Sequence, residues 1–345
     1  MSEEIYPIYI EALLKEIRTV SPQHNHKRKL ESIFFGGGTP SLLDPEHIAI
    51  ILKEIQNFFV ISNDVEITIE CNPDTVNEAK IDAYQALGIN RLSFGVQSFH
   101  KKDMDGVNRN YDPKIIPKVI EMASKKIKNI SLDLIFGLPG QSVTLWRENL
   151  EKAIALPITH LSTYELMYEE GTLMTQQQNT LKTPTEKTIL KMYDLNSTFL
   201  TKNNFKHYEI SNWYREKPCK HNLLFWRGED YLGFGLSAES LIGDTTIFQT
   251  KNLKAYVESP VTNRKVTTLE NKERMILYIQ NRLRLLEEGI DIEIFEKLFG
   301  QNEKEKLKIV LKKFPDFIEK RGYRYILKRE KCMLLDQVLW EIGRS

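Results

Sequence analysis

The strongest constraint on the fold is a repeated alternation of short β-rich runs with longer helical patterns between residues 32 and about 213. This alternation is typical of repeated βα units around a parallel sheet. We expect strands at Ser32–Phe35, Val65–Glu70, Arg91–Val96, Ile130–Phe136, Leu161–Met167 and Phe205–Ser211. We expect helices between them at Pro45–Phe59, Lys80–Leu87, Pro113–Lys126, Ser142–Leu156 and Thr185–Lys202.

The expected strands differ in polarity between their two faces, because successive side chains of a strand point in opposite directions. One face is apolar and carries Val65, Ile67, Ile69, Leu92, Phe94, Val96, Leu132 and Leu134. The other is polar and carries Glu66, Thr68, Glu70, Ser93, Gly95, Gln97, Ser131 and Asp133. A doubly wound sheet is apolar on both faces, and a packed barrel has an apolar interior. We therefore predict an α/β fold whose parallel sheet curves into a full or partial barrel, with helices outside and a polar, ligand-binding interior.

The helical pattern at Ile5–Thr19 precedes the first visible strand, whereas each of the other expected outer helices follows one. This order indicates a crossover helix whose own strand is missing from the sequence. We expect the remaining sheet to have an unpaired edge at that position.

After about residue 265 the pattern changes to helix-rich segments with one possible strand, at Glu270–Glu288, Asp291–Phe299, Tyr323–Lys328 and Leu334–Ile342. This predicts a small helical or winged-helix-like domain. We expect three parts in the chain: a barrel at 1–215, a connecting segment at 216–264 and the C-terminal domain at 265–345.

The charges nearly balance, with 48 cationic and 47 anionic side chains, so no long-range field gathers nucleic acid. The basic run Lys304–Lys313 contains carboxylates and is expected to be a solvated helix face. No apolar stretch is long enough to span a bilayer, and no signal-peptide pattern begins the sequence, so we expect a cytoplasmic protein. Peripheral membrane association and the oligomeric state stay open.

The three cysteines, Cys71, Cys219 and Cys332, lie far apart without CxxC spacing. This spacing predicts neither a disulfide framework nor a local zinc site. We expect reduced, partly buried thiols and no metal bound by them.

A run of three glycines, Gly36, Gly37 and Gly38, follows the first visible strand and precedes Thr39. Without side chains, its backbone N–H groups can approach a carboxylate or phosphate closely. The run matches neither the dinucleotide fingerprint nor the P-loop. A tight turn that needs glycine for its geometry is the alternative interpretation.

Polar residues recur at the carboxyl ends of the following strands, at Glu70, Gln97, Asp133 and Glu165, and Arg109 follows the third strand. Carboxylates suit an ammonium group or hydroxyls, and a guanidinium suits a carboxylate. Together they predict a site for a zwitterionic ligand that carries a ribose.

Four ordered motifs resemble the oxygen-independent coproporphyrinogen oxidase family of radical S-adenosylmethionine (SAM) proteins: GGGTPS at 36–41, ECNPD at 70–74, SFGVQSF at 93–99 and DLIFGLPGQ at 133–141. Two more, HYEISN at 207–212 and HNLLFW at 221–226, resemble its HemW branch of haem chaperones. The resemblance implies a partial (β/α)6 TIM-like radical SAM barrel with SAM inside. It implies SAM contacts at Gly36, Gly37, Gly38, Thr39, Glu70, Gln97, Arg109 and Asp133.

In this family a [4Fe-4S] cluster on a CxxxCxxC loop cleaves SAM, but the sequence contains no such loop. We therefore expect no radical cleavage by the chain as written. The resemblance also implies haem contact at His221, Asn222 and Trp226 and transfer of haem to an acceptor protein. Glu239 stands in GLSAES at 235–240, where the family tends to have histidine.

Three functions remain open on the sequence. The first is a haem- and SAM-binding protein of the HemW type that lacks its N-terminal strand and cluster loop. The second is oxidative decarboxylation of coproporphyrinogen III in haem biosynthesis. The third is a cluster-free remnant that keeps the haem site.

Overall fold

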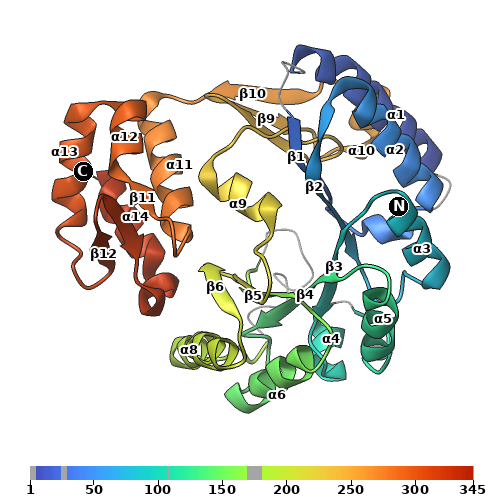
Figure 1. Cartoon of the computed structure of the whole chain (residues 1–345), viewed down its shortest axis with the longest axis horizontal. Coiled ribbons are helices and arrows are strands. Elements are labelled where there is room, and N and C mark those ends of the chain that lie inside the picture. The colour runs from blue at the N-terminus through green and yellow to red at the C-terminus, as the bar shows by residue number, and fades with distance from the viewer. Residues whose placement is uncertain (1–4, 25–28, 108, 169–180, 345) are drawn as a thin grey trace.

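The computed structural model describes residues 5–24, 29–107, 109–168 and 181–344. Its centre is a curled seven-stranded sheet in the order β1-β2-β3-β4-β5-β7-β6 (Figure 1). The first five strands pair in parallel and are β1 (Lys29–Phe35), β2 (Val60–Cys71), β3 (Arg91–Gln97), β4 (Asn129–Phe136) and β5 (His160–Glu165). The predicted α/β partial barrel is confirmed. Within the described residues, β1 forms an edge of this sheet.

Helices lie around the outside of the curve, as Figure 1 shows. They are α2 (Pro45–Phe58), α3 (Glu78–Ala86), α4 (Lys101–Gly106), α5 (Ile115–Ser124), α6 (Val143–Ile154) and α8 (Glu186–Lys202). Short 3-10 turns occur at Ser21–Gln23, Pro40–Leu42 and Arg329–Leu334. The expected helices agree with these bounds to within about two residues, apart from the short α4, which was not expected.

The two faces of the sheet differ as the strand parity predicts. Leu92, Phe94 and Val96 of β3 are completely buried, and they belong to the apolar core shared with the outer helices. On the opposite face, Ser93 donates a hydrogen bond to Asp133 of the next strand, with 3.0 Å between Oγ and Oδ2. Polar side chains therefore pair across the strands on the concave face.

The strand expected at Phe205–Ser211 is shorter and is not the next parallel neighbour of β5. Residues 206–209 form β6 (Lys206–Glu209), which turns back into β7 (Asn212–Tyr214), and β7 lies antiparallel between β5 and β6. The buried Glu209 carboxylate accepts hydrogen bonds from the Ser211 N–H and the Asn212 amide. These bonds stabilise a tight hairpin that the β-rich pattern alone does not reveal.

Helix α1 (Tyr6–Val20) packs beside α2 and α10 (Leu253–Glu258). Its Glu16 is buried and accepts three hydrogen bonds, from the Gly235 N–H, the Gln249 amide and the Tyr256 hydroxyl, at 2.7–2.9 Å. Burial raises the pKa of Glu16, although all three donors oppose this shift. The carboxylate thereby joins α1 to a segment more than 200 residues away along the chain.

Residues 216–268 contain helix α9 (Lys220–Arg227), α10 and a small antiparallel sheet in the order β10-β9-β8. Its strands are β8 (Glu239–Ile242), β9 (Thr245–Gln249) and β10 (Arg264–Thr268). This sheet was not expected from the sequence. The signal was present in Gly243-Asp244, a two-residue turn between β8 and β9 in which Gly243 has a φ of 60°.

The C-terminal region contains α11 (Asn271–Arg284), α12 (Ile292–Phe299), α13 (Gln301–Leu311) and α14 (Leu335–Arg344). They accompany a sheet ordered β11-β13-β12, formed by Ile290–Asp291, Arg324–Leu327 and Ile318–Arg321. The expected helical character of this region is confirmed, and its being a separate domain stays a prediction. Lys304, Lys306 and Lys308 pair with neighbouring glutamates, as expected for a solvated helix face. None of the described helices is long and apolar enough to cross a membrane.

Candidate functional site

The glycine run lies directly after β1 and leaves its backbone open on one side. Gly37 and Gly38 have φ angles of 78° and 66°, and no atom lies within 4 Å of a Cβ built on either residue. A Cβ on Gly36 would lie 2.7 Å from the Phe34 ring and 3.3 Å from the Glu70 carboxyl carbon. The loop therefore needs glycine twice for its backbone conformation and once for close packing.

Glu70, at the end of β2, accepts a hydrogen bond from the Gly37 N–H, with 3.1 Å between N and Oε2. Burial and the nearby Asp133 carboxyl raise the pKa of Glu70 to about 7. The Gly37 N–H and the guanidinium groups of Arg91 and Arg109 oppose this shift. Glu70 is thus a carboxyl group whose charge is sensitive to what binds beside it.

Three polar side chains converge on Gly95 at the end of β3. A Cβ on Gly95 would lie 3.1 Å from Arg109 Nη2, 3.2 Å from Gln97 Nε2 and 3.5 Å from Asn72 Oδ1. Gln97 has a φ of 66°, which is uncommon for a residue with a side chain, and the β3–β4 register shifts between Gly95 and Gln97. Such strain tends to gather at ligand sites.

Asn72 connects this cluster to the glycine loop, because its amide donates to Thr39 Oγ1 at 3.3 Å. Asp133 is on β4 and accepts from Ser93, and burial raises its pKa. The residues predicted to contact SAM therefore gather at the carboxyl ends of β1–β4. Asn72 was missed as a site residue, although it stands two positions after Glu70 and so shares its strand parity.

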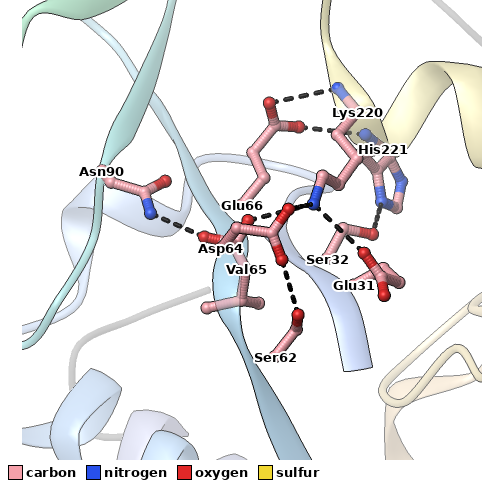
Figure 2. Close-up of polar contacts among 9 residues, drawn as sticks. All are labelled: Glu31, Ser32, Ser62, Asp64, Val65, Glu66, Asn90, Lys220 and His221. Atoms are coloured by element: carbon pink, nitrogen blue, oxygen red, sulfur yellow. Dashed lines mark hydrogen bonds and ion pairs between the residues drawn. The ribbon is translucent and has the colours of Figure 1, made fainter. Parts of the chain in front are cut away.

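Helix α9 lies on the concave side, between the sheet and the C-terminal region (Figure 1). Its first turn is held by the buried Glu66 of β2, whose carboxylate accepts from the backbone N–H groups of Lys220 and His221 at 3.1 and 2.9 Å (Figure 2). A carboxylate at this position satisfies N–H groups that a helix leaves unpaired and complements its dipole. Cys219 Sγ, just before the helix, lies 3.3 Å from the same carboxylate.

The Lys220 side chain adds an exposed set of contacts at the same place. Its Nζ lies 2.7 Å from Asp64 Oδ2 and 3.1 Å from Glu31 Oε2, as Figure 2 shows. These ion pairs are exposed to solvent and contribute little compared with the buried Glu66 contacts.

His221, a predicted haem contact, lies against β1. Its Nδ1 is 3.1 Å from Ser32 Oγ, and its ring stacks on Phe34 with 4.6 Å between the centroids. Burial lowers the pKa of His221 to about 4, so the imidazole is neutral at physiological pH. A neutral imidazole can bind a metal. Its Nε2 makes no hydrogen bond with the described residues.

Trp226, another predicted haem contact, has different neighbours. The Arg284 guanidinium lies over its ring at 4.3 Å, and Phe225 packs edge-on at 4.8 Å. No residue of α9 is fully buried, and Phe225 is 36% exposed. The structure therefore places His221 and Asn222 at the start of a partly exposed helix and Trp226 near its end.

Among the described residues, no group of three His, Cys, Asp or Glu side chains could hold a metal ion, and Cys71, Cys219 and Cys332 are buried and form no disulfide. That the chain binds no metal stays a prediction. The three cysteines are buried on different elements and do not fit a site for an iron-sulfur cluster. Glu239 is exposed at the start of β8.

The chain is similar in sequence to several known proteins. The model of the radical SAM superfamily matches residues 4–153. The heme chaperone HemW of Buchnera aphidicola from Schizaphis graminum is 34% identical over 88% of this chain and 82% of its own length. HemW of Synechocystis is 34% identical over 76% of this chain and 66% of its own length, and HemW of Escherichia coli K12 is 31% identical over 83% and 76%.

The chain belongs to the HemW family of radical SAM proteins. Its fold is also similar to that of the coproporphyrinogen III oxidase HemN from Escherichia coli, with a TM-score of 0.83 over 99% of this chain and 84% of that one. That likeness, at 22% identity, establishes the fold alone. The radical SAM family implies SAM and a [4Fe-4S] cluster as cofactors.

The Glu66 anchor predicts a specific loss of stability. Glu66→Gln leaves one carbonyl oxygen for two backbone donors, so we expect the free energy of unfolding to fall by about 2 kcal/mol. Urea denaturation measures it. Glu31→Gln is the matched control, because it changes an exposed partner of Lys220, and it should stay within about 0.5 kcal/mol of the parent. An equal fall in the free energy of unfolding in both variants would contradict the role of Glu66 in holding the first turn of α9.

Proposed function

We propose that this chain binds SAM at the carboxyl ends of β1–β4 and haem beside α9, and that it passes haem to an acceptor protein. The observation that carries the proposal is the gathering of the glycine loop, Glu70, Arg109 and Asp133 at one end of the sheet, with half-exposed α9 on the same concave side. Membership of the HemW family supports the same choice of ligands.

The chemistry of SAM suits these side chains. Its ammonium group and ribose hydroxyls can be bound by carboxylates such as Glu70 and Asp133. Its carboxylate can be bound by the Arg109 guanidinium and by N–H groups of the open Gly37-Gly38 backbone. When bound, SAM supplies a sulfonium group, and these residues orient it and neutralise its charges.

Haem suits the exposed side of α9 for a different reason. A porphyrin needs flat apolar surface, which Phe225 and Trp226 offer, and its iron accepts a neutral imidazole such as that of His221. The relatives are named heme chaperones. We therefore propose delivery of haem in preference to porphyrin decarboxylation, since the likeness to HemN rests on the fold alone.

The raised pKa of Glu70 predicts a pH dependence of SAM binding. In the free protein Glu70 is protonated below about pH 7, whereas a bound ammonium group favours the carboxylate. Binding must then release a proton, so affinity rises with pH by up to about tenfold per unit below pH 7 and levels off above it. Isothermal titration calorimetry at several pH values measures the slope.

Glu70→Gln should weaken SAM binding and flatten this slope. Glu78→Gln, an exposed substitution on α3, should leave both unchanged. A parent protein whose SAM affinity is independent of pH would show that Glu70 does not face the ammonium group.

Haem binding is tested at His221. His221→Gln removes the neutral imidazole, so we expect a shifted Soret band and at least about a tenfold weaker affinity for haemin, the ferric form of haem. Absorption titration measures both. His100→Gln, a partly exposed histidine before α4 that pairs with Glu148, is the control and should bind haemin like the parent. An unchanged Soret band in His221→Gln would rule out His221 as the iron ligand.

A further inference from the structure

A continuous line of polar side chains crosses the concave face between Asp133 and α9. Ser131 Oγ lies 3.5 Å from Asp133 Oδ1 and 2.8 Å from His160 Nδ1. His160 Nε2 lies 2.9 Å from the Tyr208 hydroxyl, which accepts from the Asn222 amide at 3.3 Å. Each end of this line is a proposed ligand contact, Asp133 for SAM and Asn222 for haem.

The middle of the line is sealed from solvent. Ser131, His160 and Tyr208 are 0%, 1% and 3% exposed. Burial and the neighbouring Arg91 guanidinium lower the pKa of His160 well below its usual value, so its imidazole is neutral. A neutral imidazole carries one proton, on either Nδ1 or Nε2. Solvent cannot readily replace a broken hydrogen bond here. Reversing the direction of one hydrogen bond therefore changes which atom must donate in the next.

The distances fit two opposite directions of hydrogen bonding. In the first, Tyr208 donates to His160 Nε2, Nδ1–H donates to Ser131, and Ser131 donates to the Asp133 carboxylate. In the second, Ser131 donates to Nδ1, Nε2–H donates to Tyr208, and the Tyr208 hydroxyl is free to donate to a rotated Asn222 amide. The two differ in which ring nitrogen carries the single proton, and the net charge does not change.

Opposing groups favour the two arrangements. The Asp133 carboxylate attracts the Ser131 hydroxyl and favours the first. Arg91 Nη2 lies 3.4 Å from His160 Nδ1 and can only donate, so it favours the second. A ligand that donates hydrogen bonds to the Asp133 oxygens competes with the Ser131 hydroxyl for them. Ligand binding at Asp133 therefore favours the second arrangement. In that arrangement the Tyr208 hydroxyl can donate a hydrogen bond to Asn222 of α9 instead of accepting one from it.

We propose that His160 and Tyr208 are positioning residues that couple SAM binding at Asp133 to the orientation of Asn222, and thereby to haem binding beside α9. This inference rests on the proposed function and adds a mechanism that connects its two sites. It also gives a role to Tyr208 of the HYEISN motif at 207–212, which neither ligand site uses directly.

The test measures haemin affinity and the Soret band of the full chain with and without saturating SAM. We expect SAM to change haemin affinity by about fivefold in the parent protein and to shift the Soret band. In Tyr208→Phe, each ligand alone should bind within about twofold of the parent, but the effect of SAM on haemin should be lost. His160→Gln, which cannot exchange its proton between two ring nitrogens, should also lose it.

Tyr214→Phe is the matched control. Tyr214 packs edge-on against Tyr208 with 5.6 Å between ring centroids, so this variant changes a neighbouring hydroxyl and should keep the coupling. Coupling that persists in Tyr208→Phe and His160→Gln overturns the inference, as does a parent protein that binds both ligands independently. Loss of haemin binding itself in both variants shows a structural role and also overturns it.

Different results would refute the proposed function and the coupling. A parent protein that binds no SAM or no haemin refutes the proposed function, and the coupling falls with it. A parent protein that binds both ligands without mutual influence refutes the coupling alone.

Discussion

The need to pair buried polar groups governs the concave face of this sheet. A parallel sheet with one polar face cannot be closed by an apolar core, because each buried donor or acceptor without a partner costs free energy. The chain meets this need with long-range contacts. Glu66 of β2 binds the first turn of α9, Ser93 binds Asp133, and His160 binds Tyr208. Helix α9 is consequently fixed on the concave side although none of its residues is fully buried.

The same requirement distinguishes the two ends of the face. Beside α9, the Glu66 carboxylate has several donors within hydrogen-bonding distance. At the carboxyl ends of β1–β4, Glu70 has one backbone donor and a pKa of about 7, and Gln97 has a strained backbone. A buried polar group to which the protein supplies few hydrogen bonds or opposite charges can obtain them from a ligand. The proposed SAM site thus includes Glu70, a carboxyl group to which the described residues supply one backbone hydrogen bond.

The polar face of the sheet was predictable from the sequence, whereas the long-range contacts across it were not, for a physical reason. The period of two along each strand identified the polar face and selected Glu70, Gln97 and Asp133, because strand parity is a local property. The β6–β7 hairpin depends on a buried glutamate, Glu209, and the partners of His160 are 29, 48 and 69 residues away. Such contacts depend on how the sheet curls, and the curl cannot be predicted from a local sequence pattern. The sheet β8–β10 was missed even though Gly243-Asp244 signals a turn.

A crystal structure of this chain grown with SAM tests the proposed site most directly. We expect ligand density at the carboxyl ends of β1–β4, in contact with the Gly37-Gly38 backbone, Glu70 and Asp133, with α9 in its present place. SAM bound elsewhere, or a complex in which Glu70 and Asp133 contact no ligand atom, would contradict it.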